Sequence, residues 1–350
     1  MKKLTSIAIL ILSFYTSAAK QLIDADTLAT LEEQAQPFTG GFSGSTFSQV
    51  EYNETKLIIR RSASLGGDLR SELRATKLAS ERGFGPTAYH TNSAEGLSVI
   101  EFVPGQFDGD RTAPLFYEQL GATLRKVHQV KLPDTSNNYF FQFLQKLEGD
   151  LIQSNKSLPT DNQEHIHLYH ALLEIAASLQ NAFPETTLCH RELNPNNILY
   201  RGKRLLLIDW ECCGNDVPGI DVADAINYYC QRDEDIDLML KGYNATEQER
   251  HVANFCRPFA YWIHGLILAK IADRCDYKSL RQQHTDLCNL SFSAFEEHLK
   301  NKTITLQLSE SKQAFTYVMF QEGIKQAQAQ SFQEALRYLQ QSAPKQSNAA

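Results

Sequence analysis

Cysteine pairs with metal-binding spacing are absent from this sequence. Its 350 residues include seven cysteines, an odd number, and no two of them form a C-x-x-C pair. Neither a disulfide framework nor a zinc site is indicated, so we expect unpaired thiols that are mostly buried among apolar side chains. An excess of positive charge is also missing, because the formal net charge is −7. This charge argues against a general nucleic-acid-binding protein.

The sequence also has no apolar run that is long enough for a comfortable membrane span. The best candidate, residues 7–15, follows two lysines and precedes the small residues 16–19. This arrangement is typical of a secretory signal peptide. A wrongly assigned start and an unusual N-terminal helix are the alternatives. We therefore expect no stable membrane span.

The most informative stretch is a polar loop at residues 190–197 that is followed by a hairpin pattern. The apolar runs 198–200 and 205–208 flank a turn at Gly202, which predicts two short antiparallel strands. Such a hairpin brings Asn197 and Asp209 together at its two ends. An amide oxygen beside a carboxylate suits a hard cation such as Mg²⁺. Glu192 has the spacing of the carboxylate that accepts a hydroxyl proton in kinase catalytic loops.

These residues carry a resemblance to a known family. The segments His190 to Asn197 and Ile208 to Glu211 are similar to those of the aminoglycoside phosphotransferase-like small-molecule kinases, nearest the choline/ethanolamine kinase and thiamine kinase branch. The resemblance covers residues 37–300 and implies an α+β, two-lobed protein-kinase-like fold. The N-lobe would be a small antiparallel sheet, and the C-lobe mainly helical. The family normally has Asp at the position of Glu192, so this chain departs from its pattern there.

The resemblance implies a nucleotide site in the N-lobe. A loop rich in glycine and serine would bind the phosphates of ATP, although such a loop is more often a plain hairpin turn. Arg60 best matches the cation of the third strand, with Arg61 as a neighbouring candidate, and Glu72 would hold it in place. Backbone groups of residues 101–103 would bind adenine. The cofactor-binding residues are thus Gly41, Ser43, Gly44, Ser45, Thr46, Arg60, Glu72, Glu101 and Val103.

The acceptor site is expected in the helical half of the chain. Aromatic faces bind cationic groups, so Tyr228 and Trp262 are candidates, with Glu211 adding charge complementarity. Ordinary helix packing is the alternative for each aromatic residue. Asp221 resembles the family's aspartate that braces the catalytic loop, and it also fits an ordinary helix N-cap.

The domain organisation follows from these patterns. We expect a signal-like segment at 1–19, an N-lobe at 20–105, a C-lobe at 106–303, a helical extension at 304–341 and a disordered tail at 342–350. The extension resembles half a tetratricopeptide unit. Since one such pair forms no solenoid alone, it packs on the kinase body or contacts a partner.

The resemblance implies a kinase that transfers the γ-phosphoryl group of ATP to the hydroxyl of a small, cationic molecule, with Mg²⁺ as the metal. Glu192 would act on the hydroxyl, and Asn197 and Asp209 would hold the metal. A chemistry that needs ATP, together with unpaired cysteines, favours the cytoplasm. The alternative is a catalytically impaired kinase-fold binding protein, possibly exported, which Glu192 and residues 1–19 favour.

Overall fold

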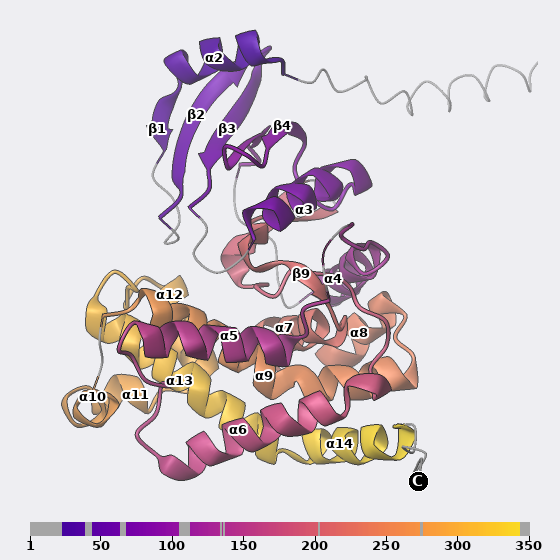
Figure 1. Cartoon of the computed structure of the whole chain (residues 1–350), viewed down its shortest axis with the longest axis vertical. Coiled ribbons are helices and arrows are strands. Elements are labelled where there is room, and N and C mark those ends of the chain that lie inside the picture. The colour runs from indigo at the N-terminus through magenta and orange to yellow at the C-terminus, as the bar shows by residue number, and fades with distance from the viewer. Residues whose placement is uncertain are drawn as a thin grey trace, which may run out of the picture.

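The computed structural model shows two lobes, a sheet-containing one above and a helical one below in Figure 1. It describes residues 23–38, 44–63, 68–104, 113–133, 135, 137–201, 204–273 and 276–343. The signal-like segment and two residues of the predicted phosphate loop, Gly41 and Ser43, lie outside this part of the chain. No helix within it is long and apolar enough to cross a membrane.

The N-lobe is a five-stranded antiparallel sheet in the order β1-β2-β3-β5-β4 with two helices. Its elements are α2 (Ala25–Gln34), β1 (Gln36–Phe38), β2 (Thr46–Tyr52), β3 (Thr55–Arg61), α3 (Leu69–Arg82), β4 (Ala88–Asn92) and β5 (Leu97–Glu101). Apolar residues of α2 and of the central strands share one small core, which includes Leu31, Leu57 and Val99. This lobe confirms the predicted antiparallel sheet.

Helix α3 has clear signals at both ends. Asp68 caps its start by accepting a hydrogen bond from the Arg70 N–H, and Gly83 ends it in the left-handed region at φ 76°. A glycine is favoured there because a side chain would be strained at this φ. The helix is therefore fixed in length, which sets the position of Glu72 in its first turn.

The C-lobe is mainly helical, as predicted. Its helices are α4 (Pro114–Val127), α5 (Phe140–Gln153), α6 (Gln163–Ser178), α7 (Gly219–Tyr229), α8 (Asp233–Tyr243), α9 (Glu247–Ile271), α10 (Tyr277–Gln283), α11 (Thr285–Cys288), α12 (Phe292–Lys300), α13 (Ser309–Gln328) and α14 (Gln330–Ser342). Its short strands are β6 (Thr187–Cys189), β7 (Ile198–Arg201), β8 (Arg204–Leu207) and β9 (Gly214–Asp216). The strands pair as β6 with β9 and as β7 with β8, both antiparallel.

The predicted C-terminal extension consists of α13 and α14, and both pack on α9 (Figure 1). Phe320, Ile324 and Phe332 belong to the same buried cluster as Phe259 of α9. The first of the two alternatives, packing on the kinase body, is therefore what the structure shows. A contact with a partner stays a prediction.

Candidate active site

Hydrogen bonds to the start of α7 hold the loop at residues 190–197 in place. The carboxylate of Asp221 accepts the His190 N–H over 2.7 Å and the Arg191 N–H over 2.8 Å. It also meets His128 Nε2 at 3.2 Å, and its pKa is lowered because these donors outweigh its burial. Asp221 therefore braces the loop. It is not the helix N-cap, since Pro218 has that position.

Arg191 is a buried anchor of the same loop. Its backbone is left-handed at φ 66°, and its side chain is 1% exposed. The guanidinium donates from Nε to Asp216 Oδ2 over 2.8 Å and also bonds the Asn138 carbonyl. Gly214 permits this approach, because a Cβ there would lie 2.9 Å from the guanidinium. Burial raises the pKa of Asp216 to about 6 although Arg191 opposes the shift.

The predicted hairpin forms from β7 and β8, with Ile198 opposite Leu207. The Ile208 N–H donates to the Asn197 carbonyl over 3.0 Å, so Asn197 and Asp209 lie at the same end of the hairpin. The Asn197 amide donates from Nδ2 to the Glu192 carbonyl over 2.9 Å, which leaves its Oδ1 for another partner. The structure thus brings Glu192, Asn197 and Asp209 to one place.

Glu192 is half-buried, and its surroundings disfavour a charge on it. Burial raises the pKa of Glu192 to about 7, with further contributions from Asp209, Glu211 and Asp224 against an opposing effect of His264. The Asn194 amide lies 3.3 Å from its Oε1. A carboxyl group with a pKa near the working pH is suited to accept a proton and release it again.

Arg60 of β3 lies among three carboxylates from both lobes. Its guanidinium is 3.2 Å from Glu72, 2.9 Å from Asp209 and 3.5 Å from Glu211. Glu72 also accepts from the Ser62 hydroxyl over 2.7 Å. Burial lowers the pKa of Arg60, but the three carboxylates outweigh it and the net direction is upward.

The arrangement around Arg60 distinguishes between the candidates Arg60 and Arg61, and it changes the expected position of Glu211. Arg61 points the other way, to Glu32 of α2 at 2.5 Å, so Arg60 is the arginine at the site. Neighbouring side chains alternate faces along a strand, which is why only one of them can reach it. Glu211, a predicted acceptor residue, is 7% exposed and contacts Arg60. The structure therefore places it beside the predicted nucleotide residues.

The other described residues of the predicted nucleotide site lie at strand ends, just before and at the start of β2 and at and just after the end of β5. Gly44 is left-handed at φ 76°, and the Ser45 hydroxyl accepts the Ala63 N–H over 3.2 Å. Thr46 begins β2 opposite Arg61. In the predicted adenine-binding segment 101–103, the Glu101 N–H donates to the Thr87 carbonyl over 2.8 Å, and the Glu101 side chain pairs with Arg201. Val103 is buried, and its N–H has no partner within the described chain.

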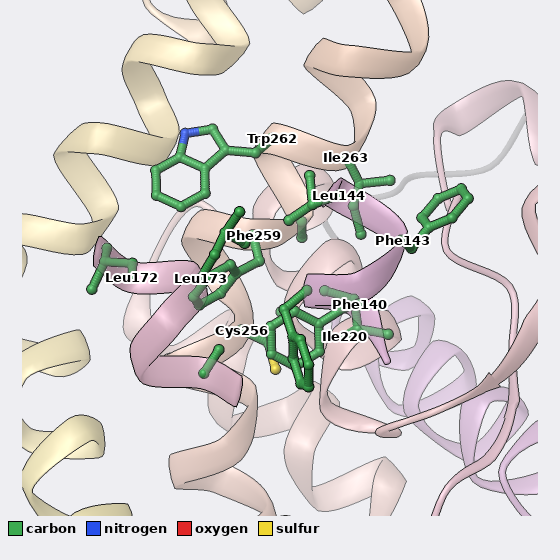
Figure 2. Packing of buried hydrophobic residues seen from close by; sticks show 14 of the residues in the cluster. Phe140, Phe143, Leu144, Leu172, Leu173, Ile220, Cys256, Phe259, Trp262 and Ile263 are labelled. Carbon is green, nitrogen blue, oxygen red and sulfur yellow. The ribbon is translucent and has the colours of Figure 1, made fainter. Parts of the chain in front are cut away.

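The two predicted acceptor aromatics differ in position. Trp262 of α9 lies in the buried core of the helical lobe, and Figure 2 shows it with Phe259 and Leu172. Its indole N–H donates to the Phe320 carbonyl over 3.2 Å. The structure therefore does not bring Trp262 to the loop. Tyr228 of α7 is half-buried and packs edge-to-face with His264. The His264 ring contacts Asp224, which contributes to the raised pKa of Glu192.

Three residues that hold the site were missed by reading the sequence: Asp216, Asp224 and His264. Asp224 lies one helical turn after Asp221, so the helical period could have placed both on the loop side of α7. Asp216 and His264 had no comparable signal. His264 lies 40 residues from Asp224 in a largely apolar helix, and only the packing of α9 on α7 brings them together.

The donor set fits a divalent cation. Among the described residues around Arg60, the carboxylates of Glu72, Asp209 and Glu211 outnumber its single positive charge. A site with such an excess of oxygen donors and negative charge favours Mg²⁺ with its phosphate ligands. Asp209 Oδ1 is a buried atom that forms an ion pair with Arg60 Nη1 at 2.9 Å.

The sequence of this chain matches a known protein family. Residues 34–254, more than half of the chain, match the family described as "Phosphotransferase enzyme family". The chain belongs to this family. A curated relative, Protein LicA of Haemophilus influenzae, is 34% identical over 67 residues, which are 19% of this chain and 25% of LicA. The chain thus spans a quarter of that relative's length.

Solved structures share the phosphotransferase fold. A choline/ethanolamine kinase family protein from Mesorhizobium loti has a TM-score of 0.61 and 16% identity, covering 92% of this chain and 97% of that one. A spectinomycin phosphotransferase in complex with ADP and spectinomycin has a TM-score of 0.51 and 13% identity, covering 88% and 99%. At these identities the likeness confirms the predicted two-lobed kinase-like fold.

Proposed function

We propose that this phosphotransferase is a small-molecule kinase that moves the γ-phosphoryl group of ATP to a hydroxyl of a small, cationic molecule. Choline, ethanolamine and thiamine represent the class. The observation that carries the proposal is the meeting of Glu192, Asn197 and Asp209 at the end of one hairpin, within reach of Arg60. Phosphoryl transfer depends mostly on positioning and charge neutralisation, which is what these residues offer.

Each residue has a distinct role in this proposal. Arg60 binds phosphate oxygens while Glu72 fixes its orientation, and the segment that includes Gly44, Ser45 and Thr46 covers the phosphates. Asn197 and Asp209 would hold Mg²⁺, which neutralises phosphate charge when bound. Glu192 accepts the proton of the attacking hydroxyl. The backbone of residues 101–103 meets the adenine.

The choice of a cationic acceptor rests on the charge around Glu192. Asp209, Glu211 and Asp224 contribute negative charge there against the opposing effect of His264. Asp224 and Glu192 also act on Tyr228, whose ring packs against Phe292. A positively charged molecule is favoured by both features. We place the reaction in the cytoplasm, because it consumes ATP and all described cysteines are unpaired.

The test combines nucleotide binding with an acceptor screen. The purified full-length chain is titrated with ATP with and without Mg²⁺, and ADP formation is then measured with choline, ethanolamine, thiamine and an aminoglycoside. We expect Mg²⁺-dependent ATP binding that is lost in Asp209→Ala, and acceptor-dependent ADP formation with one of the cations.

Three outcomes would contradict parts of this proposal. ATP binding that does not depend on Mg²⁺ or on Asp209 would overturn the metal assignment. Mg²⁺-dependent binding without turnover of any acceptor would favour the kinase-fold binding protein, for which the substitution at Glu192 is the supporting observation. Recovery of a mature protein that starts near Lys20 from a periplasmic fraction would overturn the cytoplasmic assignment.

A further inference from the structure

The residue that follows Glu192 is held on both sides by α7. The Leu193 N–H donates to Asp224 Oδ2 over 2.7 Å, and its carbonyl accepts from the Tyr229 hydroxyl over 3.0 Å. The Leu193 side chain is fully buried. Both hydrogen-bonding groups of this residue are therefore fixed, immediately after the proposed proton acceptor.

Asp224 is itself fixed by a histidine from another helix. His264 of α9 places Nε2 at 2.8 Å from Asp224 Oδ1, while its Nδ1 lies 3.4 Å from the Tyr228 hydroxyl. Asp224 is 2% exposed and His264 is 5% exposed. Each oxygen of the Asp224 carboxylate thus has one partner, so the carboxylate has a single favoured orientation.

The charge on this pair strengthens the contact. Burial lowers the pKa of His264, but Asp224 and then Glu192 and Glu296 outweigh it, and the net direction is upward. A protonated histidine makes a charge-assisted hydrogen bond, which is shorter and stronger than a neutral one. Removing one member of a buried charged pair leaves the other without its partner, which is costly.

We propose that His264 is a positioning residue for Glu192. It orients Asp224, and Asp224 fixes the peptide bond between Glu192 and Leu193. The catalytic consequence rests on the proposed kinase function. Glutamate has one more rotatable bond than aspartate, so its carboxylate reaches the acceptor hydroxyl only if the backbone beside it is held firmly. A misplacement of about 1 Å can cost on the order of 100-fold in rate.

The experiment compares His264→Phe, which keeps a ring but loses the donor, with His264→Gln, which keeps a donor near Nε2. His167→Gln on the surface of α6 is the matched control. For the acceptor with the highest turnover, we expect His264→Phe to lower kcat by about 10- to 100-fold. KM for ATP and Mg-ATP affinity should change less than about twofold, and His264→Gln should recover most of the rate.

A second measurement keeps the inference testable whatever the activity. Hydrogen exchange of peptides that cover residues 190–197 should become faster in His264→Phe and in Asp224→Asn, and should not change in His167→Gln. Asp224→Asn is included because it keeps the shape of the side chain should the Phe variant fold poorly. Its effect combined with His264→Phe should be no larger than that of the stronger single variant, since both act on one contact.

The outcomes separate this inference from the proposed function. An inactive wild-type chain would contradict the kinase proposal, and faster exchange in the variants would still support the Asp224–His264 clamp. Unchanged exchange in both variants would overturn the clamp. An active wild type with an undiminished kcat in His264→Phe would overturn the positioning role. Equal losses in His264→Phe and His264→Gln would also count against it, because the donor would then not matter.

Discussion

Arg60 and Asp209 come from different lobes and form an ion pair, with 2.9 Å between Nη1 and Oδ1. The same guanidinium contacts Glu72 of α3 and Glu211 after β8. One arginine therefore connects the sheet, the helix beside it and the end of the β7–β8 hairpin. Together with the Glu101–Arg201 pair, this side chain links the sheet that carries the predicted phosphate-binding residues to the hairpin that carries the predicted metal-binding residues.

The first prediction concerns Arg60. Arg60→Ala should weaken Mg-ATP binding by about tenfold or more, because hydrogen bonds to charged groups contribute about 1.5–3 kcal/mol. The affinity of Arg60→Lys for Mg-ATP should lie between those of the wild type and Arg60→Ala, since lysine keeps the charge but loses the fork of donors. Titration calorimetry measures the affinities.

Arg61→Ala is the matched control for that measurement. Arg61 is the next residue on β3, but it pairs with Glu32 at the surface, so its loss should leave the affinity for Mg-ATP nearly unchanged. An equal loss of affinity in both variants would contradict the assignment of Arg60.

The second prediction concerns Glu192. Glu192→Gln should abolish most turnover and leave Mg-ATP binding nearly unchanged, because we propose that this residue meets the acceptor and not the nucleotide. Glu192→Asp shortens the side chain by about 1.5 Å, the length of one carbon–carbon bond. It should fail to improve kcat, since the loop around Leu193 is built for the longer side chain.

Steady-state kinetics with the best acceptor provide the readout for both variants. A large gain in kcat from Glu192→Asp would show instead that the natural chain is an impaired kinase. No turnover by the wild type or by the Asp variant would support the binding-protein alternative.

The sequence predicted the local parts of this site because their signals are local. The hairpin between Asn197 and Asp209 follows from two apolar runs and a glycine turn, and the register of β7 and β8 agrees with it. Glu72 was placed by the helix that contains it. Arg60 and Arg61 could not be separated by composition, since only the direction of each side chain from β3 distinguishes them.

Contacts between residues that lie far apart in the sequence could not be predicted from such local patterns. Trp262 looked like an acceptor residue because aromatic side chains serve both cation binding and helix packing. Its role in packing becomes visible only with α13, where a Cβ on Gly323 would lie 2.2 Å from its indole nitrogen. Glu211 was expected at the acceptor site, but it contacts Arg60, which lies on a strand 151 residues earlier in the sequence.

The third prediction concerns the buried pair of Arg191 and Asp216. Asp216→Ala should lower the free energy of unfolding by about 3–5 kcal/mol, because it leaves a buried guanidinium without its carboxylate. Asp237→Ala removes the partner of Arg250 in an exposed pair and should cost at most about 1 kcal/mol. Urea unfolding followed by tryptophan fluorescence measures both. A similar small cost in the two variants would mean that Arg191 finds another partner or water.

The last prediction concerns the pH dependence of the Asp224–His264 contact. The pKa of His264 is raised above its ordinary value of 6.5, since Asp224, Glu192 and Glu296 outweigh its burial. A group with a raised pKa binds its proton more tightly in the folded chain than in the unfolded chain. Its contribution to stability is therefore complete below pH 6.5 and is lost as the pH rises through the folded-state pKa.

The difference in unfolding free energy between the wild type and His264→Gln isolates this contribution. Measured by urea unfolding from about pH 5.5 to 9, the difference should be largest at the acid end and should shrink as the pH rises. The comparison is made in a Glu192→Gln background, because His264 opposes the raised pKa of Glu192 and the titration of that carboxyl would otherwise differ between the two proteins. His167→Gln is the control at an exposed position of α6 and should give only a small difference. A pH-independent difference for His264→Gln would mean that His264 is neutral in the folded chain, so that the neutral ring alone holds Asp224.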